Sequence, residues 1–124
     1  MKAYDIELLL SCAGGGFDYW CQIDFETDDY RKAKAEMVEK KILPEFGSKF
    51  CVEQVVAYMI TNGYKVYIND VEDEKKYLIT PEMLGKGFEL NAKNHPEDAS
   101  LEDGDANTAD RILQYAVFGE VVYS

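Results

Sequence analysis

The hydrophobic positions are most regular near the end of the chain, in residues 107–124. Their spacing of three and four residues is that of a helix with one apolar face. The residues on this face are Ala109, Ile112, Leu113, Ala116 and Val117. Asp105, Asn107 or Thr108 can cap the start of the helix, and a glycine at 119 stands where helices commonly end. We predict a core helix here, followed by a packed apolar end at Val121, Val122 and Tyr123.

Shorter patterns predict four helices earlier in the chain. The segments are residues 4–12, 30–43, 48–61 and 80–91. A Thr-Asp-Asp cluster at 27–29 starts the second helix, and Pro44 ends it because proline disfavours the helical conformation of the preceding residue. Ser48 caps the third helix, and an Asn-Gly pair closes it. Thr80 caps the fourth, with proline at the first helical position.

A second type of pattern, alternation with period two, predicts a half-buried strand in residues 17–25. Its apolar positions are Phe17, Tyr19, Cys21, Ile23 and Phe25. Trp20 falls on the opposite, more polar face. Residues 64–68 and 76–79 flank an acid-rich segment at 69–75, which predicts a β-hairpin. The fold class is therefore α+β, a single domain over residues 1–124 in which a small three-stranded antiparallel sheet packs against four to five helices.

Length and composition agree with one folded domain. The chain has 124 residues, of which 47% are hydrophobic, and this is enough to bury a core without metal or disulfide support. No apolar run approaches the roughly 20 residues that span a bilayer, and an acid interrupts the apolar start of the chain. We expect a cytoplasmic protein with no membrane partner.

The charge points to basic partners. Twenty-four acids against thirteen bases give a net charge of −11, which argues against a direct nucleic-acid or anionic membrane surface. Residues 30–49 are the exception, because six bases outnumber three acids there. The bases are Arg31, Lys32, Lys34, Lys40, Lys41 and Lys49. A solvated helix face is the simpler interpretation of this segment.

The sequence shows no reaction chemistry. Three cysteines, Cys12, Cys21 and Cys51, and one histidine, His95, lack the spacing of a disulfide framework or a zinc site. We expect reduced, partly buried thiols that act as small apolar residues.

Two loop motifs that suggest a ligand are incomplete. The glycines at 14–16 lack the Lys-Ser/Thr of a phosphate loop. A calcium loop starting at Asp103 would have Thr108 in place of its turn glycine and Gln114 in place of its glutamate. Acid pairs arise by chance in so acidic a chain. We therefore predict no metal, no cofactor and no enzymatic activity.

The acids occur in blocks. Residues 17–29 hold five acids and no base, residues 70–74 hold four acids and no base, and residues 95–124 hold seven acids and one arginine. Such blocks on a rigid scaffold can imitate the phosphates of a nucleic acid, although an acidic surface also serves solubility alone. The candidate partner-binding residues are Glu97, Asp98, Glu102, Asp103, Asp105, Asp70, Glu72, Asp73, Glu74, Asp28, Asp29 and Trp20.

Two stretches resemble the signatures of a protein family. Residues 15–21, GGFDYWC, are similar to a Gly-Gly-x-x-Tyr-Trp motif, and residues 109–123, ADRILQYAVFGEVVY, are similar to a closing Ala-Asp…Gln-x-Ala-x-Phe-Gly-Glu-x-Val-aromatic motif. Both motifs belong to small uncharacterised proteins of bacteriophages and other mobile elements. The basic helix of this chain departs from that family. The resemblance implies a mobile-element context, in which small acidic proteins often inhibit host defence nucleases, and it implies no cofactor or catalytic residue.

Charge and resemblance together give a functional expectation. We expect a non-enzymatic inhibitor, of the anti-CRISPR or anti-restriction type, that covers the basic surface of a host nucleic-acid-binding defence protein as a nucleic-acid mimic. It would act in the host bacterial cell. The alternative is a phage accessory or assembly protein that acts through homo-oligomerisation, with residues 121–123 as the pairing edge of a homodimer.

Overall fold

A computed structural model describes residues 3–13, 20–42, 44, 50–99, 101 and 106–123 of the chain. Its helices are α1 (Ala3–Ala13), α2 (Thr27–Glu39), α3 (Val52–Thr61), α4 (Pro81–Asn94), the short 3-10 helix η2 (Pro96–Asp98) and α5 (Ala106–Phe118). Its strands are β1 (Cys21–Phe25), β2 (Val66–Asp70) and β3 (Lys75–Leu78). The strands form one antiparallel sheet in the order β1-β2-β3. The predicted α+β class and three-stranded antiparallel sheet are confirmed.

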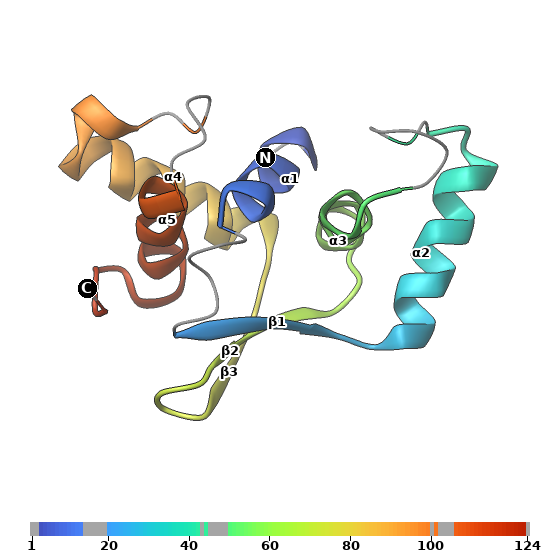
Figure 1. Cartoon of the computed structure of the whole chain (residues 1–124), viewed down its shortest axis with the longest axis horizontal. Helices are drawn as coiled ribbons and strands as arrows, with labels where there is room; N and C mark the ends of the chain where they lie inside the picture. Colours follow the sequence, from blue (N-terminus) through green and yellow to red (C-terminus); the bar gives the residue numbers. More distant parts are fainter. Residues whose placement is uncertain are drawn as a thin grey trace.

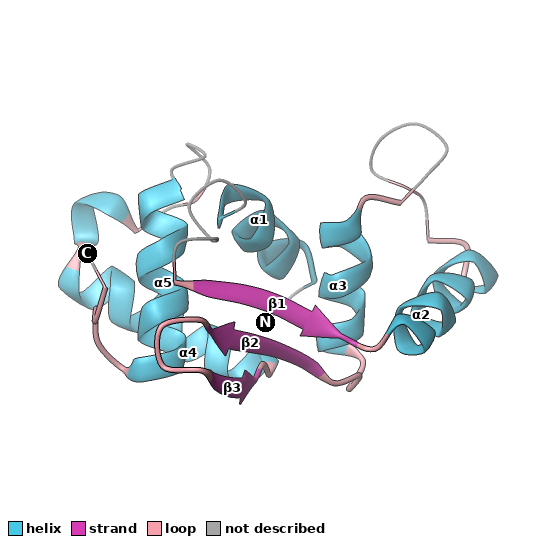
Figure 2. Ribbon diagram, turned by 60° about the horizontal axis from the view of Figure 1, so that its bottom comes forward, coloured by secondary structure: helices cyan, strands magenta, loops and turns pink. Residues whose placement is uncertain are grey.

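The helices and the sheet form two layers. In Figure 1 the sheet is the lower layer and α1, α3, α4 and α5 lie above it, while α2 stands at one end of the molecule. Figure 2 shows the three strands side by side. Within the described residues, α5 packs on α4 and α1, and α3 packs on α1 and α2. The core therefore lies between the sheet and the inner helices, and α2 flanks it.

The two faces of the sheet differ as alternation requires. The face toward the helices carries the buried residues Cys21, Val66, Ile68 and Asp70. The opposite face carries polar residues, among which Lys76 Nζ lies 3.0 Å from Asp24 Oδ2 in an exposed ion pair. One face of the sheet is thus part of the core, and the other meets solvent.

The predicted C-terminal helix is confirmed as a core element. Ala109, Ile112 and Leu113 are buried in α5, and Gly119 follows the helix with a φ of 77°, a conformation that glycine adopts without strain. A Cβ at Gly87 of α4 would lie 2.5 Å from the Ile112 carbonyl oxygen. The absence of a side chain at this position is what lets α4 and α5 approach so closely.

The start of α5 limits which residues can cap it. Because α5 begins at Ala106, Asn107 and Thr108 are helical residues, and the prediction that either of them caps the helix is wrong. Asp105, the third capping candidate, lies outside the described residues.

The helix boundaries differ from the predicted ones most clearly at the end of α2, the start of α3 and the end of α4. Helix α2 ends at Glu39, before Pro44, because Lys41 adopts a left-handed φ of 60° and Ile42 N–H donates to the Met37 carbonyl. This is the hydrogen-bond pattern that closes helices with a left-handed residue. Helix α3 begins at Val52, and its predicted cap at 48 lies outside the described residues. Helix α4 is capped as predicted, since Thr80 Oγ1 accepts from Met83 N–H at 3.2 Å, but it extends to Asn94.

The predicted position of Trp20 is wrong. Trp20 precedes β1, and its side chain is 0% exposed instead of lying on the polar face. The indole packs against Phe118 and Tyr123 near the end of the chain, with ring centroids 5.3 and 5.6 Å away. Because α5 and the residues after it cover this side chain, the alternation of β1 does not extend back to Trp20. The predicted strand residues 17–19 lie outside the described residues.

Candidate functional site

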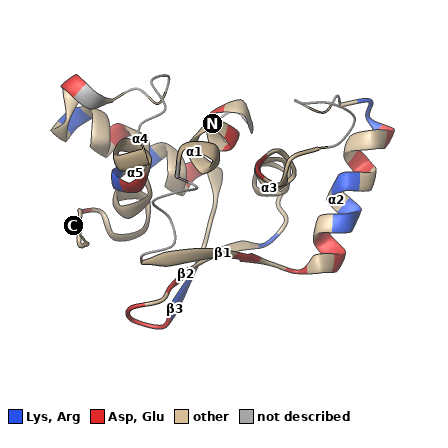
Figure 3. Cartoon of the chain, in the orientation of Figure 1, with Lys and Arg blue, Asp and Glu red and all other residues tan. Residues whose placement is uncertain are grey.

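The exposed acids of the β2–β3 hairpin form the best-defined acidic site. We call residues 71–74, which join the two strands, the acidic turn. Glu72, Asp73 and Glu74 are all exposed there, next to an exposed Val71. In the part of the chain that the structure describes, no lysine or arginine forms an ion pair with these three carboxylates. Figure 3 shows the turn as an acidic tip, away from the basic residues of α2.

The backbone of the acidic turn is fixed by Asp70. Its side chain is 0% exposed, and its Oδ1 accepts from the backbone N–H of Glu72 at 2.9 Å and of Asp73 at 3.2 Å. The Tyr123 hydroxyl lies 3.2 Å from Oδ1 and 3.0 Å from Oδ2, and it donates to this carboxylate. Asp70 was predicted to contact a partner, but a buried and hydrogen-bonded carboxylate is not available for that. Its role is to shape the turn.

Tyr123 is itself held by residues of α5. We call residues 119–123, which follow the helix, the C-terminal strap. The buried Gln114 accepts from the N–H of Val122 and of Tyr123, both at 2.8 Å, and donates from Nε2 to the Tyr123 carbonyl at 2.9 Å. Gln114 Nε2 also donates to Asp110 Oδ2 at 3.1 Å. One amide side chain therefore fixes the backbone of the strap much as a neighbouring strand would.

Trp20 completes this arrangement. Its Nε1–H donates to Asp110 Oδ1 at 2.7 Å, and its carbonyl accepts from Val71 N–H, at the start of the acidic turn, at 2.8 Å. The indole stacks on the Tyr123 ring at an interplanar angle of 26°. We call Trp20, Asp110, Gln114, Tyr123 and Asp70 the bracing network. Trp20 and Asp70 are both fully buried, so they support the surface residues and do not contact a partner directly.

Sequence reasoning missed the bracing network, although a signal for it was present. Four of its members lie in the two stretches from which we expected a family resemblance, Trp20 in the first and Asp110, Gln114 and Tyr123 in the second. The structure brings these two stretches together. A motif at each end of a chain can thus mark a structural contact rather than a reactive site.

The environment of Tyr123 keeps its hydroxyl protonated. Burial, and then the hydrogen bond to Asp70, raise the pKa of Tyr123 to about 12. A phenol neutral below this pH remains a donor to the carboxylate under all ordinary conditions. The contact that fixes the turn is therefore insensitive to pH near neutrality.

The other predicted acids do not join the acidic turn. Asp28 is exposed and Asp29 is half-buried in the first turn of α2, where the positive end of the helix dipole stabilises acids. Glu97 is exposed in η2, and of Asp98 only the backbone is described. Glu102, Asp103 and Asp105 lie outside the described residues. In Figure 1 the acidic turn, the start of α2 and η2 lie in separate parts of the molecule, so these blocks do not form one surface.

No metal-binding or membrane-spanning feature is present in the described residues. Cys12, Cys21 and Cys51 form no disulfide, and no three described His, Cys, Asp or Glu side chains gather in a way that could hold a metal ion. None of the helices in the described ranges has both the length and the apolar character needed to cross a membrane.

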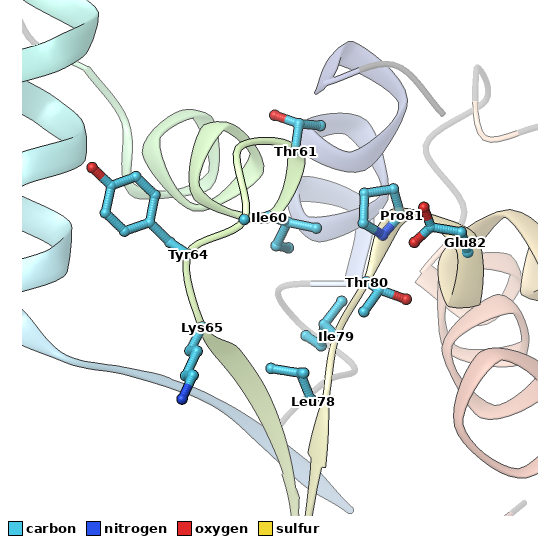
Figure 4. A pocket seen from close by; sticks show the side chains of 10 residues that line it. Ile60, Thr61, Tyr64, Lys65, Leu78, Ile79, Thr80, Pro81 and Glu82 are labelled. Carbon is cyan, nitrogen blue, oxygen red and sulfur yellow. The ribbon is translucent and has the colours of Figure 1, made fainter.

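A cleft of about 400 Å³ lies between the end of α3 and the start of α4. Figure 4 shows its apolar wall, formed by Ile60, Leu78, Ile79 and Pro81. The hydroxyl of Tyr64, at the rim, points to α2, where it donates to a glutamate. The Thr80 hydroxyl accepts the capping bond of α4. These rim hydroxyls are engaged in structural contacts, and no group of reactive side chains converges in the cleft.

Comparisons with known proteins add no further constraint. Searches against protein-family models, curated proteins and solved structures find no match to this chain.

Proposed function

We propose that this chain is a non-enzymatic acidic binding protein that uses the acidic turn to cover a basic surface on a nucleic-acid-binding protein. The supporting observation is the turn itself, in which three exposed carboxylates stand on a backbone held by the buried Asp70. A preorganised loop loses little conformational freedom on binding, so more of its interaction energy contributes to affinity. Together with the resemblance to phage and mobile-element proteins, this favours an inhibitor of a host defence protein.

The proposed mechanism is replacement of phosphates by carboxylates. Glu72, Asp73 and Glu74 would take the positions of backbone phosphates and form charge-assisted hydrogen bonds with lysine and arginine of the target. The target would then be unable to hold nucleic acid at the same place. Such binding weakens as salt rises, because counterions return to the basic surface on dissociation.

The net charge would favour the encounter. The protein has a net charge of −11, and the exposed acids Glu72, Asp73 and Glu74 lie at the tip of the hairpin. Figure 3 shows this acidic tip apart from α2, which carries acids as well as bases. A basic target is therefore attracted to the molecule, which raises the rate of association.

The test is a charge reversal with a matched control. Glu72→Lys, Asp73→Lys and Glu74→Lys together should weaken binding to a target captured from host lysate by at least about tenfold. The control combines Glu39→Lys, Glu82→Lys and Glu89→Lys, which are exposed elsewhere and change the net charge equally. Binding is measured by competition with nucleic acid for the target over a salt series. Equal losses in the two triple variants would show that only net charge matters, and unchanged competition in the turn variant would rule out the acidic turn.

The alternative, an accessory or assembly protein that forms homo-oligomers, has one observation in its favour. Val121 and Val122 are 40% and 50% exposed on the C-terminal strap, so the prediction that they are packed is wrong and only Tyr123 of that segment is half-buried. The backbone N–H of Val122 and Tyr123 donates to Gln114, however, so this segment offers these two donors to no second copy. A molar mass that rises with concentration in light scattering, and falls in a Val121→Ser, Val122→Ser variant, would favour this alternative.

A further inference from the structure

We infer that the C-terminal strap sets the shape of the acidic turn, with Tyr123 as the positioning residue. The effect on partner binding rests on the function proposed above, but the coupling between strap and turn stands on its own. The two elements meet at one buried carboxylate, Asp70, which receives the backbone of the turn on one side and the hydroxyl of Tyr123 on the other.

The hydrogen bonds divide between the two oxygens of Asp70. Oδ1 accepts from Glu72 N–H and Asp73 N–H, at 2.9 and 3.2 Å. The Tyr123 hydroxyl at 3.0 Å is the donor to Oδ2 within the described residues. Without that hydroxyl, a buried carboxyl oxygen is left without a hydrogen-bond donor, which is costly. Asp70 then rotates toward water, and the two amides of the turn lose their acceptor.

The position of the hydroxyl is determined from α5 and not from the hairpin. Gln114 makes three hydrogen bonds to the strap backbone and a fourth to Asp110, which accepts from the indole of Trp20. The Tyr123 ring packs against both Trp20 and Phe118, at centroid distances of 5.6 and 5.9 Å. The strap is therefore anchored on a rigid helix, and its tyrosine reaches the hairpin as a fixed support.

The coupling has a direct consequence for recognition. The spacing of the carboxylates depends on the turn backbone, in which Glu74 has a left-handed φ of 55° that the surrounding structure must maintain. A turn that has lost its support samples other conformations, and a partner must then select the productive one. Tyr123, which lies 53 positions after Asp70 in the sequence, thus controls the affinity of the acidic turn although it does not itself lie on the binding surface.

Removal of the single hydroxyl by Tyr123→Phe tests this inference. The ring still packs on Trp20, so the core is retained, while amide hydrogen exchange at Glu72 and Asp73 should become about tenfold faster relative to the amides of α3. Tyr77→Phe is the matched control, because Tyr77 contacts the same aromatic cluster through Phe118 and its hydroxyl has no hydrogen bond within the described residues. The control should leave both amides of the turn as protected as in the parent.

The outcomes separate the inference from the proposed function. Unchanged exchange at Glu72 and Asp73, or equal acceleration in α3, would overturn the inference, because Tyr123 would then not act on the turn in particular. Selective acceleration together with weaker target binding supports both. Selective acceleration with unaltered target binding supports the coupling and counts against the acidic turn as the binding site.

Discussion

Within the described residues, tyrosine hydroxyls donate to carboxylates in two different settings. In the turn pair, Tyr123 donates to Asp70, which is 0% exposed and also holds the backbone of the acidic turn. In the α2 pair, Tyr64 donates to Glu36, a half-buried residue of α2 that also accepts from Tyr58 at 2.9 Å. Lys40 donates to the Tyr58 hydroxyl at 2.9 Å and extends this second cluster toward solvent.

The physical causes of the pKa shifts differ between the pairs. In each pair the pKa of the tyrosine is raised to about 12. For Tyr64 the hydrogen bond to Glu36 is the main cause, whereas for Tyr123 burial comes first and the bond to Asp70 second. The hydrogen bonds from Tyr64 and then Tyr58 also lower the pKa of Glu36. The α2 pair is thus a contact between two half-buried residues, whereas the turn pair joins a half-buried tyrosine to a fully buried carboxylate.

The difference shows how one interaction serves two purposes. The α2 pair fastens a peripheral helix, whose buried residues Ala33 and Met37 pack on α3. The turn pair connects a core helix to an exposed loop and fixes the conformation of that loop. Because the acids of the acidic turn stand on a backbone held by the buried Asp70, whereas Asp28 and Asp29 stand on a peripheral helix, the acidic turn is the better candidate for specific recognition.

The largest expected effect comes from the core beneath the turn pair. Leu113 is buried in α5, and Leu113→Ala should lower the free energy of unfolding by about 2–5 kcal/mol, through lost burial and the cavity left behind. Denaturant midpoints measure this change. A variant as stable as the parent would show that α5 does not organise the domain.

The elements that could be predicted from sequence are those whose pattern is local. The C-terminal helix and the hairpin follow from periodicity, and the exposure of Glu72, Asp73 and Glu74 follows from their place between two strands. The end of α2 could not be predicted, since it depends on a left-handed Lys41, a conformation uncommon for lysine.

The bracing network could not be predicted because its contacts are distant in sequence. Trp20 and Asp110 are 90 residues apart, and Asp70 and Tyr123 are 53 apart. Periodicity places a residue on a face of its own element but does not say which other element covers that face. For that reason Asp70 was predicted to be a surface acid and Trp20 a surface aromatic, although both are buried.

A second prediction compares the attachment of α2 with that of the hairpin. Met37 is buried where α2 packs on α3, and Met37→Ala should cost about 2–3 kcal/mol, the low end for such changes, because a peripheral helix can adjust to the cavity. The loss should appear as faster amide exchange in α2, with the amides of Glu72 and Asp73 unaffected. If the turn amides accelerate equally, α2 and the hairpin belong to one cooperative unit.

A third prediction uses two glycines of α4 as a matched pair. Gly87→Ala forces the new Cβ against the Ile112 carbonyl and should destabilise the domain by about 1–3 kcal/mol. Gly85→Ala, where a Cβ meets nothing within 4 Å, should stabilise it by about 0.4–1 kcal/mol, because alanine restricts the unfolded chain. Thermal unfolding of both variants measures the difference. Similar effects of the two changes would mean that α4 and α5 are not in close contact at Gly87.

The smallest expected effect distinguishes the two pairs by alkaline titration. Tyrosine ionises near pH 10 in the unfolded chain, whereas Tyr64 and Tyr123 have a pKa of about 12 in the folded state. Their contribution to stability is therefore complete below pH 10 and is lost as the pH rises from 10 to 12. Burial also raises the pKa of Tyr30, so ultraviolet titration should find several late-ionising tyrosines. One of them should disappear in Tyr64→Phe and another in Tyr123→Phe.

The salt dependence of the two tyrosine pKa values tests the comparison further. The shift at Tyr64 depends mainly on its contact with the half-buried Glu36, so high salt should weaken it and move the ionisation of Tyr64 to lower pH. The shift at Tyr123 comes first from burial, which salt does not screen, so its late ionisation should persist. The measurement is the titration of each single Phe variant at low and high salt. Equal responses of the two tyrosines would mean that solvent reaches the turn pair as freely as the α2 pair, and the strap would then not shield Asp70.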